Sequence, residues 1–180
     1  MKRLLLSLLL LCAVPASAAI LYSRFSHPTG DYVIEYPAHW KRSLGLQAVY
    51  LHPAGKLAPQ ALISLERYPL GKDSPRTPED FEKDLRKDLG FVKKLESEGS
   101  KEISGVRARR LVMTMTDDSR PVRDPSGGRY KEIVVILPLR GGFYYVLKLA
   151  GVGRGFEKAL PEFEKIIGRL RLPVPDIEKK

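Results

Sequence analysis

Residues 131–150 read KEIVVILPLRGGFYYVLKLA and hold two apolar runs on either side of a glycine pair. Every side chain in residues 133–137 is apolar, which is typical of a strand covered on both faces, because a strand with one wet face carries polar residues at alternate positions. The Gly141–Gly142 pair predicts a turn, and residues 143–150 predict a second strand. This stretch therefore indicates an antiparallel hairpin at the centre of a sheet.

Alternation with a period of two predicts further strands upstream of this hairpin. Phe25 to Tyr36 predicts an N-terminal hairpin that turns at Thr29–Gly30 and stops at Pro37, with Trp40 as an apolar plug at the sheet edge. The other strands are expected at residues 48–52, 61–68, 92–98, 106–116 and 130–137.

The first helix has a clear start signal. Thr77 is a natural N-cap, Pro78 stands at the first helical position, and Asp80 takes the third place of a capping box. Phe81 and Leu85 begin its apolar stripe. We expect this helix to end near Gly90.

A second helix is predicted near the C-terminus, where large apolar residues recur at steps of 4, 3, 4 and 3. These residues are Phe156, Leu160, Phe163, Ile167 and Leu170. Because proline is tolerated only in a first turn, Pro161 predicts that the regular helix starts near Leu160.

The order of these elements is hairpin, strands, helix, antiparallel meander and helix. Strands and helices that segregate in this way are typical of the α+β class rather than of alternating βαβ units. A central strand that is apolar on both faces needs a cover on each side. The sequence thus predicts an antiparallel β-sheet with helices on both faces, an α/β/α sandwich.

The N-terminus has the pattern of a bacterial secretory signal peptide. Lys2 and Arg3 precede an apolar run too short to span a bilayer as a permanent helix, and Ala16–Ser17–Ala18 is a signal-peptidase site. We expect a signal peptide at residues 1–18, cleaved after Ala18, and hence a protein exported to the periplasm or beyond.

The mature chain is expected to form one domain at residues 19–172, with an unstructured proline-bearing tail at 173–180 and no transmembrane segment. Cys12, the single cysteine, lies in the signal peptide, and Leu11 before it argues against lipoprotein processing. The mature domain therefore has neither a disulfide nor a cysteine nucleophile.

The chain is basic, with 31 Lys+Arg against 21 Asp+Glu, and loss of the signal peptide leaves a net charge of +8. Residues 99–140 contain nine basic and five acidic residues. Export argues against nucleic acid and for an anionic envelope component or an acidic protein as partner. The predicted contacts with such a surface are Arg107, Arg109, Arg129 and Lys131. The alternative is that solvated strand faces simply carry arginine.

Candidate sites for chemistry are sparse, and the sequence assigns no catalytic, cofactor-binding or metal-binding residue. His27 with Asp31 or Glu35 has suitable ligand types for a metal, but the spacing matches no signature. The other histidines, His39 and His52, fall near strand ends. A loop with Asp117, Asp118 and Asp124 has oxygen ligands that calcium prefers, but it lacks EF-hand spacing. A secreted hydrolase with a triad assembled from dispersed residues remains the alternative function.

Five short motifs in this order resemble the PsbP-like group, also described as Mog1/PsbP/DcrB-like domains. They are YVIEYPAHW at residues 32–40, TPEDF at 77–81, GVRA at 105–108, FYYV at 143–146 and IIGRL at 166–170. The group contains lumenal subunits of photosystem II, an adaptor for a nuclear-transport GTPase, and exported bacterial proteins. The resemblance implies an α/β/α sandwich that acts as a non-catalytic binding or accessory module. We also expect the mature protein to be a monomer. It transfers no site residue, because the shared positions are those of the fold.

Overall fold

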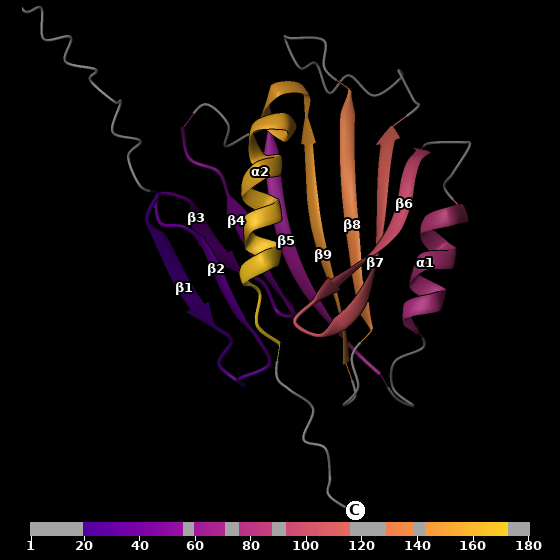
Figure 1. Ribbon diagram of the computed structural model, residues 1–180, viewed down its shortest axis with the longest axis horizontal. Coiled ribbons are helices and arrows are strands. Elements are labelled where there is room, and N and C mark those ends of the chain that lie inside the picture. The colour runs from indigo at the N-terminus through magenta and orange to yellow at the C-terminus, as the bar shows by residue number, and fades with distance from the viewer. Residues whose placement is uncertain are drawn as a thin grey trace, which may run out of the picture.

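The computed structural model describes residues 20–55, 60–70, 76–87, 93–115, 129–138 and 143–172. Within them the chain forms a seven-stranded antiparallel sheet of order β3-β4-β5-β9-β8-β7-β6, a two-stranded sheet and two helices (Figure 1). The elements are β1 Tyr22–Ser26, β2 Val33–Pro37, β3 Lys41–Leu44, β4 Ala48–His52, β5 Ala61–Pro69, α1 Pro78–Lys87, β6 Lys93–Ile103, β7 Val106–Met115, β8 Tyr130–Pro138, β9 Phe143–Val152 and α2 Gly153–Arg169. The predicted signal peptide, the Asp117–Asp124 loop, the Gly141–Gly142 turn and the tail lie outside the described residues.

The β8–β9 hairpin lies in the middle of the large sheet, as the apolar run predicts. Residues 133–137 of β8 are all buried, and β8 pairs with β7 on one side and β9 on the other. Alternate side chains of β8 join two separate apolar clusters, with Val135 on the α2 side and Val134 on the α1 side. The two clusters confirm a sheet that is covered on both faces.

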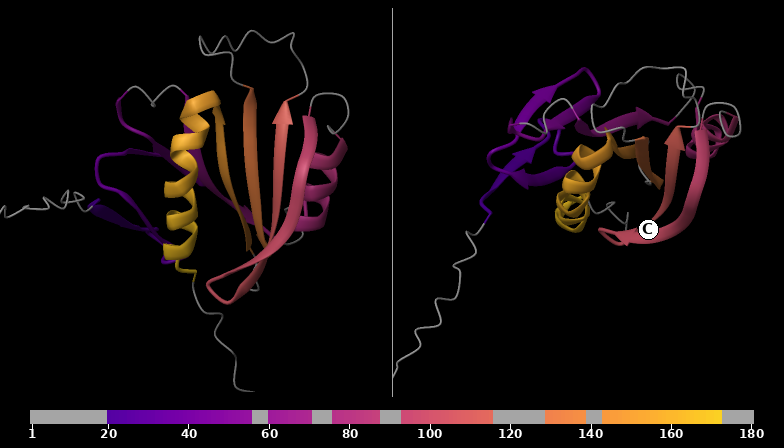
Figure 2. Two further views of the ribbon diagram at one scale, coloured as in Figure 1. Left: turned by 45° about the horizontal axis from the view of Figure 1, so that its top comes forward. Right: turned by 90° about the horizontal axis from the view of Figure 1, so that it is seen from above.

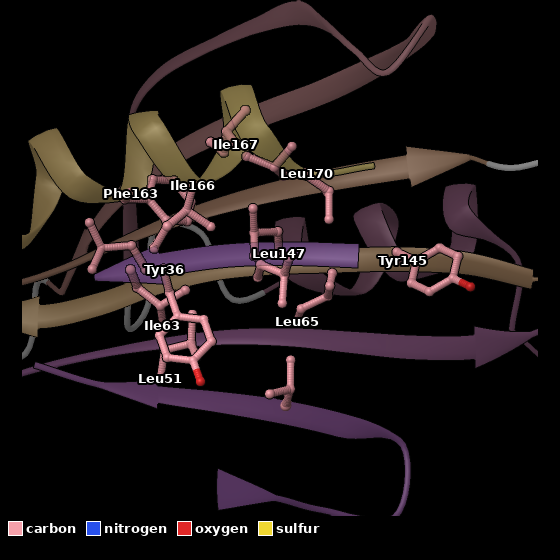
Figure 3. Close-up of a cluster of buried hydrophobic side chains, with 14 of the residues drawn as sticks. Tyr36, Leu51, Ile63, Leu65, Tyr145, Leu147, Phe163, Ile166, Ile167 and Leu170 are labelled. Carbon is pink, nitrogen blue, oxygen red and sulfur yellow. The ribbon is translucent and has the colours of Figure 1, made fainter. Parts of the chain in front are cut away.

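The larger cluster lies between the sheet and α2. Figure 3 shows Phe163 and Ile166 of α2 pointing towards Ile63 and Leu147 of β5 and β9. The β1–β2 hairpin covers the same side of the sheet and contributes Tyr36 to this cluster.

The smaller cluster lies under α1, on the opposite face of the sheet, and Phe81 is its buried helical member. The predicted capping box forms at the start of α1. The Asp80 amide donates to Thr77 Oγ1 over 3.1 Å, and the Thr77 amide donates to Asp80 Oδ2 over 3.2 Å. Figure 2 shows α1 and α2 on opposite sides of the curved sheet.

The predicted start of α2 near Leu160 is wrong, because the helix begins at Gly153 and Pro161 lies inside it. Pro161 cannot donate the hydrogen bond that the Glu157 carbonyl would otherwise accept. Pro161 and Glu157 are both exposed, so water can reach that carbonyl. Burial of Phe156 and Ala159 against the sheet offsets the loss and keeps the first two turns helical.

Two further strands differ from the sequence prediction. β3, which is exposed along its whole length, is not predicted, since its side chains show no apolar alternation. β6 continues to Ile103, beyond the predicted end at Glu98, because its polar residues pair with β7 in a regular ladder. In both cases the strand forms because it pairs with an adjacent strand, β4 or β7, and not because of an apolar pattern in its own sequence.

The chain after α2 closes the α2 side of the molecule. Val33 of β2 and Arg171 exchange two backbone hydrogen bonds, of 2.8 and 2.9 Å. The Ser104 hydroxyl, at the tip of the β6–β7 hairpin, donates to the Leu170 carbonyl. No helix in the described part of the chain is long and apolar enough to cross a membrane.

Candidate functional site at the β6 edge

The four predicted surface contacts fall on two faces of the sheet. Arg107, Arg109 and Leu111 are two residues apart along β7, so their side chains lie on the same face of the sheet. Leu111 belongs to the α1-side cluster, so this is the α1 face. Lys131 instead pairs with Thr114, on the α2 side, where Val112 packs. Arg129 precedes β8 and is exposed. The four residues therefore do not form one basic patch.

Arg109 has a structural partner that the sequence did not indicate. Its Nη1 lies 2.8 Å from Oε2 of Glu82, a carboxylate of α1 with a side chain only 7% exposed. Arg86 lies 2.8 Å from the other oxygen of Glu82. Lys131 has a long contact of 3.8 Å with Glu96. Arg107 is exposed and forms no ion pair with the described residues.

The histidine candidates form a local turn network rather than a metal centre or a catalytic relay. His27 Nδ1 lies 3.2 Å from Asp31 Oδ2, and Thr29 hydrogen-bonds to both of these side chains. Arg67 also forms an ion pair with Asp31, with 2.7 Å between Arg67 Nη1 and Asp31 Oδ2. Glu35 is drawn away to Arg169.

The other two histidines stay apart from this network. His52 Nε2 lies 3.1 Å from Ser43 Oγ, and His39 is exposed. Among the described residues no three histidine, cysteine or carboxylate side chains are grouped to hold a metal.

β6 is one edge of the large sheet, and the turn that ends it fixes which backbone groups face outward. Ser104 and Gly105 have φ of 50° and 75° and connect the paired residues Ile103 and Val106, as in a type I′ turn whose first carbonyl bonds to the fourth amide. Because hydrogen-bonded and non-bonded pairs alternate along an antiparallel ladder, residues 97, 99 and 101 bond to β7.

The same alternation directs another set of backbone groups away from β7. The N–H and C=O groups of Glu98, Ser100 and Glu102 point outward from the sheet edge. All three residues are exposed.

A cleft of about 270 Å³ flanks this edge on the α2 side. Glu164 of α2 stands in its wall and receives two cations, Lys101 at 2.8 Å and Arg110 at 2.7 Å. Val112 forms an apolar part of the wall. One carboxylate thus faces two positive charges.

A second cleft, of about 280 Å³, flanks the edge on the α1 side. Arg86 and Arg109 line it together with Glu82 and Glu98. Arg86 bonds to Glu98 as well as to Glu82. This hydrogen bond from Arg86 lowers the pKa of the Glu98 carboxyl.

Glu98, Gly99, Ser100 and Arg110 line both clefts, so the two hollows meet across one short piece of β6. Sequence reasoning singled out Arg109 but not its carboxylate partner or Glu164. Both acids come from helices, and only the docking of each helix on the sheet brings them to the strand. The local signal available was small, a Gly–Ser pair inside a run of charged residues.

Comparisons with protein-family models and with curated proteins gave no match. Solved structures, in contrast, match over most of the chain. The cyanobacterial PsbP protein (CyanoP) of Synechocystis matches with a TM-score of 0.58 and 12% identity, over 91% of this chain and 99% of that one. The Ran-binding protein Mog1p of Saccharomyces cerevisiae matches with a TM-score of 0.57 and 7% identity, over 86% and 96%.

A third match is LpqN of Mycobacterium tuberculosis, described as involved in cell envelope biogenesis. Its TM-score is 0.50 and its identity 12%, over 86% of this chain and 92% of that one. At such low identities the likeness concerns the fold and not the activity. Together with the α1–sheet–α2 layering, these matches show that the chain has the PsbP/Mog1-like α+β sandwich fold.

Proposed function

We propose that this protein is an exported, non-catalytic binding or accessory module, and that the β6 edge is its docking surface. The observation that carries the proposal is the pair of charged clefts on the two faces of an open edge strand. Each cleft presents arginine or lysine donors together with a carboxylate. Such an arrangement can orient a partner, and it offers no activated nucleophile.

The structural neighbours support the same kind of role. One is named as a Ran-binding protein and another as a protein of envelope biogenesis. The resemblance to PsbP-like domains, which implies a non-catalytic module, favours an accessory role over the hydrolase alternative. Export rests on the signal-peptide pattern of residues 1–18.

A protein partner is favoured over a flat anionic lipid or polymer surface. A flat anionic surface binds best to a basic patch on one side of a protein. Arg107 and Lys131, however, lie on opposite faces of the sheet. The clefts, in contrast, carry charges of both signs. Mixed charges of this kind suit a partner with its own defined pattern of charges.

The absence of cysteine from the expected mature chain allows a direct test. A benzophenone attached to Ser100→Cys should cross-link to one envelope protein when the labelled mature protein is added to its own envelope fraction. The same label on Lys158→Cys, an exposed position on α2, is the matched control.

Equal labelling from both positions would contradict a docking surface at β6. If the protein instead binds vesicles of anionic lipid at low salt, and Arg107→Gln weakens this binding, the partner is an anionic surface.

A further inference from the structure

We propose that β6 binds an extended, acidic segment of a partner protein as an added β-strand. This inference rests on the proposed function and specifies how the docking surface works. An added strand gains affinity from main-chain hydrogen bonds and specificity from pockets for its alternate side chains. The β6 edge supplies both requirements.

The backbone requirement is met by the outward-facing residues of β6. Glu98, Ser100 and Glu102 offer three N–H and three C=O groups at the regular spacing of a strand. The register irregularity between Leu95 and Ser97 lies upstream, and from Ser97 to Ile103 the pairing with β7 is unbroken. Seven consecutive residues therefore present an edge without a register break.

Two long side chains in the middle of this edge are held to one side by ion pairs within the protein. Glu98 is bound by Arg86, over the α1 face, and Lys101 by Glu164, over the α2 face. Between them stand only Gly99 and Ser100. A Cβ added at Gly99 would meet no atom within 4 Å, so the place beside this residue is open on the α2 face.

Alternate side chains of an added strand would point into the two clefts. The side chain that passes Gly99 would enter the α2-side cleft, next to Lys101 and Arg110. Glu98 also lines this cleft, but its carboxylate is paired with Arg86 on the α1 face. Glu164 is therefore the one carboxylate that pairs with Lys101 and Arg110, which leaves an excess positive charge beside Gly99 on the α2 face. A carboxylate at this position of the partner balances that charge, and the basic character of the whole domain steers acidic chains towards it.

The opposite edge of the sheet, β3, does not offer the same site. It has four residues, all exposed, whereas β6 has eleven. Neither of the two clefts described above borders β3.

The probe for the test is a displayed library of random ten-residue peptides selected on the mature protein. We expect the selected peptides to combine an acidic residue with β-branched or aromatic neighbours. They should slow amide exchange at Glu98, Ser100 and Glu102 of the unmodified protein, a measurement that needs no variant.

The decisive pair of variants is Ser100→Pro and Ser100→Ala. Proline removes an outward N–H without breaking a bond to β7, and the preceding Gly99 accommodates it. We expect Ser100→Pro to weaken peptide binding at least tenfold and Ser100→Ala to leave it within twofold. Equal binding to both variants, or selected peptides without amide protection in β6, would overturn strand addition.

The charge preference is tested separately. Replacing the acidic residue of a selected peptide by its amide should weaken binding to the wild type about tenfold, and much less to Lys101→Gln. An equal loss on both proteins would overturn the role of the α2-side cleft. Site-specific cross-linking from Ser100 tests the docking surface itself, so it can succeed while strand addition fails.

Discussion

Arg109 and Glu82 bind β7 to α1 through a contact of 2.8 Å between Nη1 and Oε2. The Glu82 side chain is 7% exposed and that of Arg109 is 58% exposed. A largely buried carboxylate is thus paired with a guanidinium group that lies at the surface. Arg107, two residues earlier on the same face, is exposed and forms no ion pair with the described residues. The two arginines therefore have different roles despite their identical chemistry.

Substitution of each arginine by glutamine should separate these roles. We expect Arg109→Gln to lower the free energy of unfolding by on the order of 1 kcal/mol, because Glu82 loses one of its two cationic partners. Arg107→Gln should change it by less than about 0.5 kcal/mol. Urea titration of both variants measures the difference, and equal stabilities would contradict a structural role for Arg109.

Pro161→Ala should stabilise the protein. The proline lies in the interior of α2, is exposed, and removes one helical hydrogen bond. Alanine restores that bond and has the best helix propensity, so we expect a gain of about 1–3 kcal/mol. A raised midpoint of thermal unfolding confirms it. Unchanged or lower stability would show that the proline is adapted to a local bend.

Phe163→Ala should be strongly destabilising, since Phe163 is 0% exposed and faces the sheet from the middle of α2 (Figure 3). Loss of a buried aromatic side chain costs about 3–5 kcal/mol. Denaturant titration gives the value, with Leu160→Ala, a partly buried position on the same helix, as the milder comparison. A loss below about 1 kcal/mol would mean that α2 contributes little to the core.

Glu66 should make stability fall in acid. Burial would raise the pKa of its carboxyl, but hydrogen bonds from Lys148, Tyr68 and Ser64 outweigh burial and lower it. A carboxyl with a lowered pKa in the folded state stabilises above its ordinary pKa and loses this contribution as pH falls through the folded value.

Glu66→Gln should therefore be less stable than the wild type at pH 7 and approach it below about pH 4. Thermal unfolding across this range tests the expectation. Glu157→Gln, on the exposed side of α2, is the control. A constant difference between wild type and Glu66→Gln at all pH values would contradict it.

Signal cleavage after Ala18 predicts a mature protein that starts at Ala19. The intact mass of the exported protein measures this directly. A retained Met1, or a lipid on Cys12, would contradict the signal-peptide prediction.

The sequence predicts the parts of this fold that depend on local patterns. The doubly apolar run at residues 133–137 indicates the central strand, and Thr77 with Asp80 marks the start of α1. The start of α2 could not be predicted in the same way, because propensity at Pro161 opposes helix while burial of Phe156 on the sheet supports it. Tertiary packing decides between these two effects, and a rule based on local sequence alone has no information on that packing.

The candidate site was less predictable than the fold. Charge counting finds the arginines of β7 but not the faces on which they lie, since a single strand does not say which face each helix covers. The partners Glu82 and Glu164 come from helices far away in sequence. Only the packed arrangement shows that the free backbone of β6 stands between two clefts.

The pairing of Val33 with Arg171 has a consequence for how the chain can fold. The β1–β2 hairpin, which is made first, completes its packing only when the last described residues arrive. Contacts of such long sequence separation form slowly. A chain that still lacks these residues thus cannot close the α2-side core, a delay that would suit the export proposed above, in which the chain passes a membrane pore before it folds.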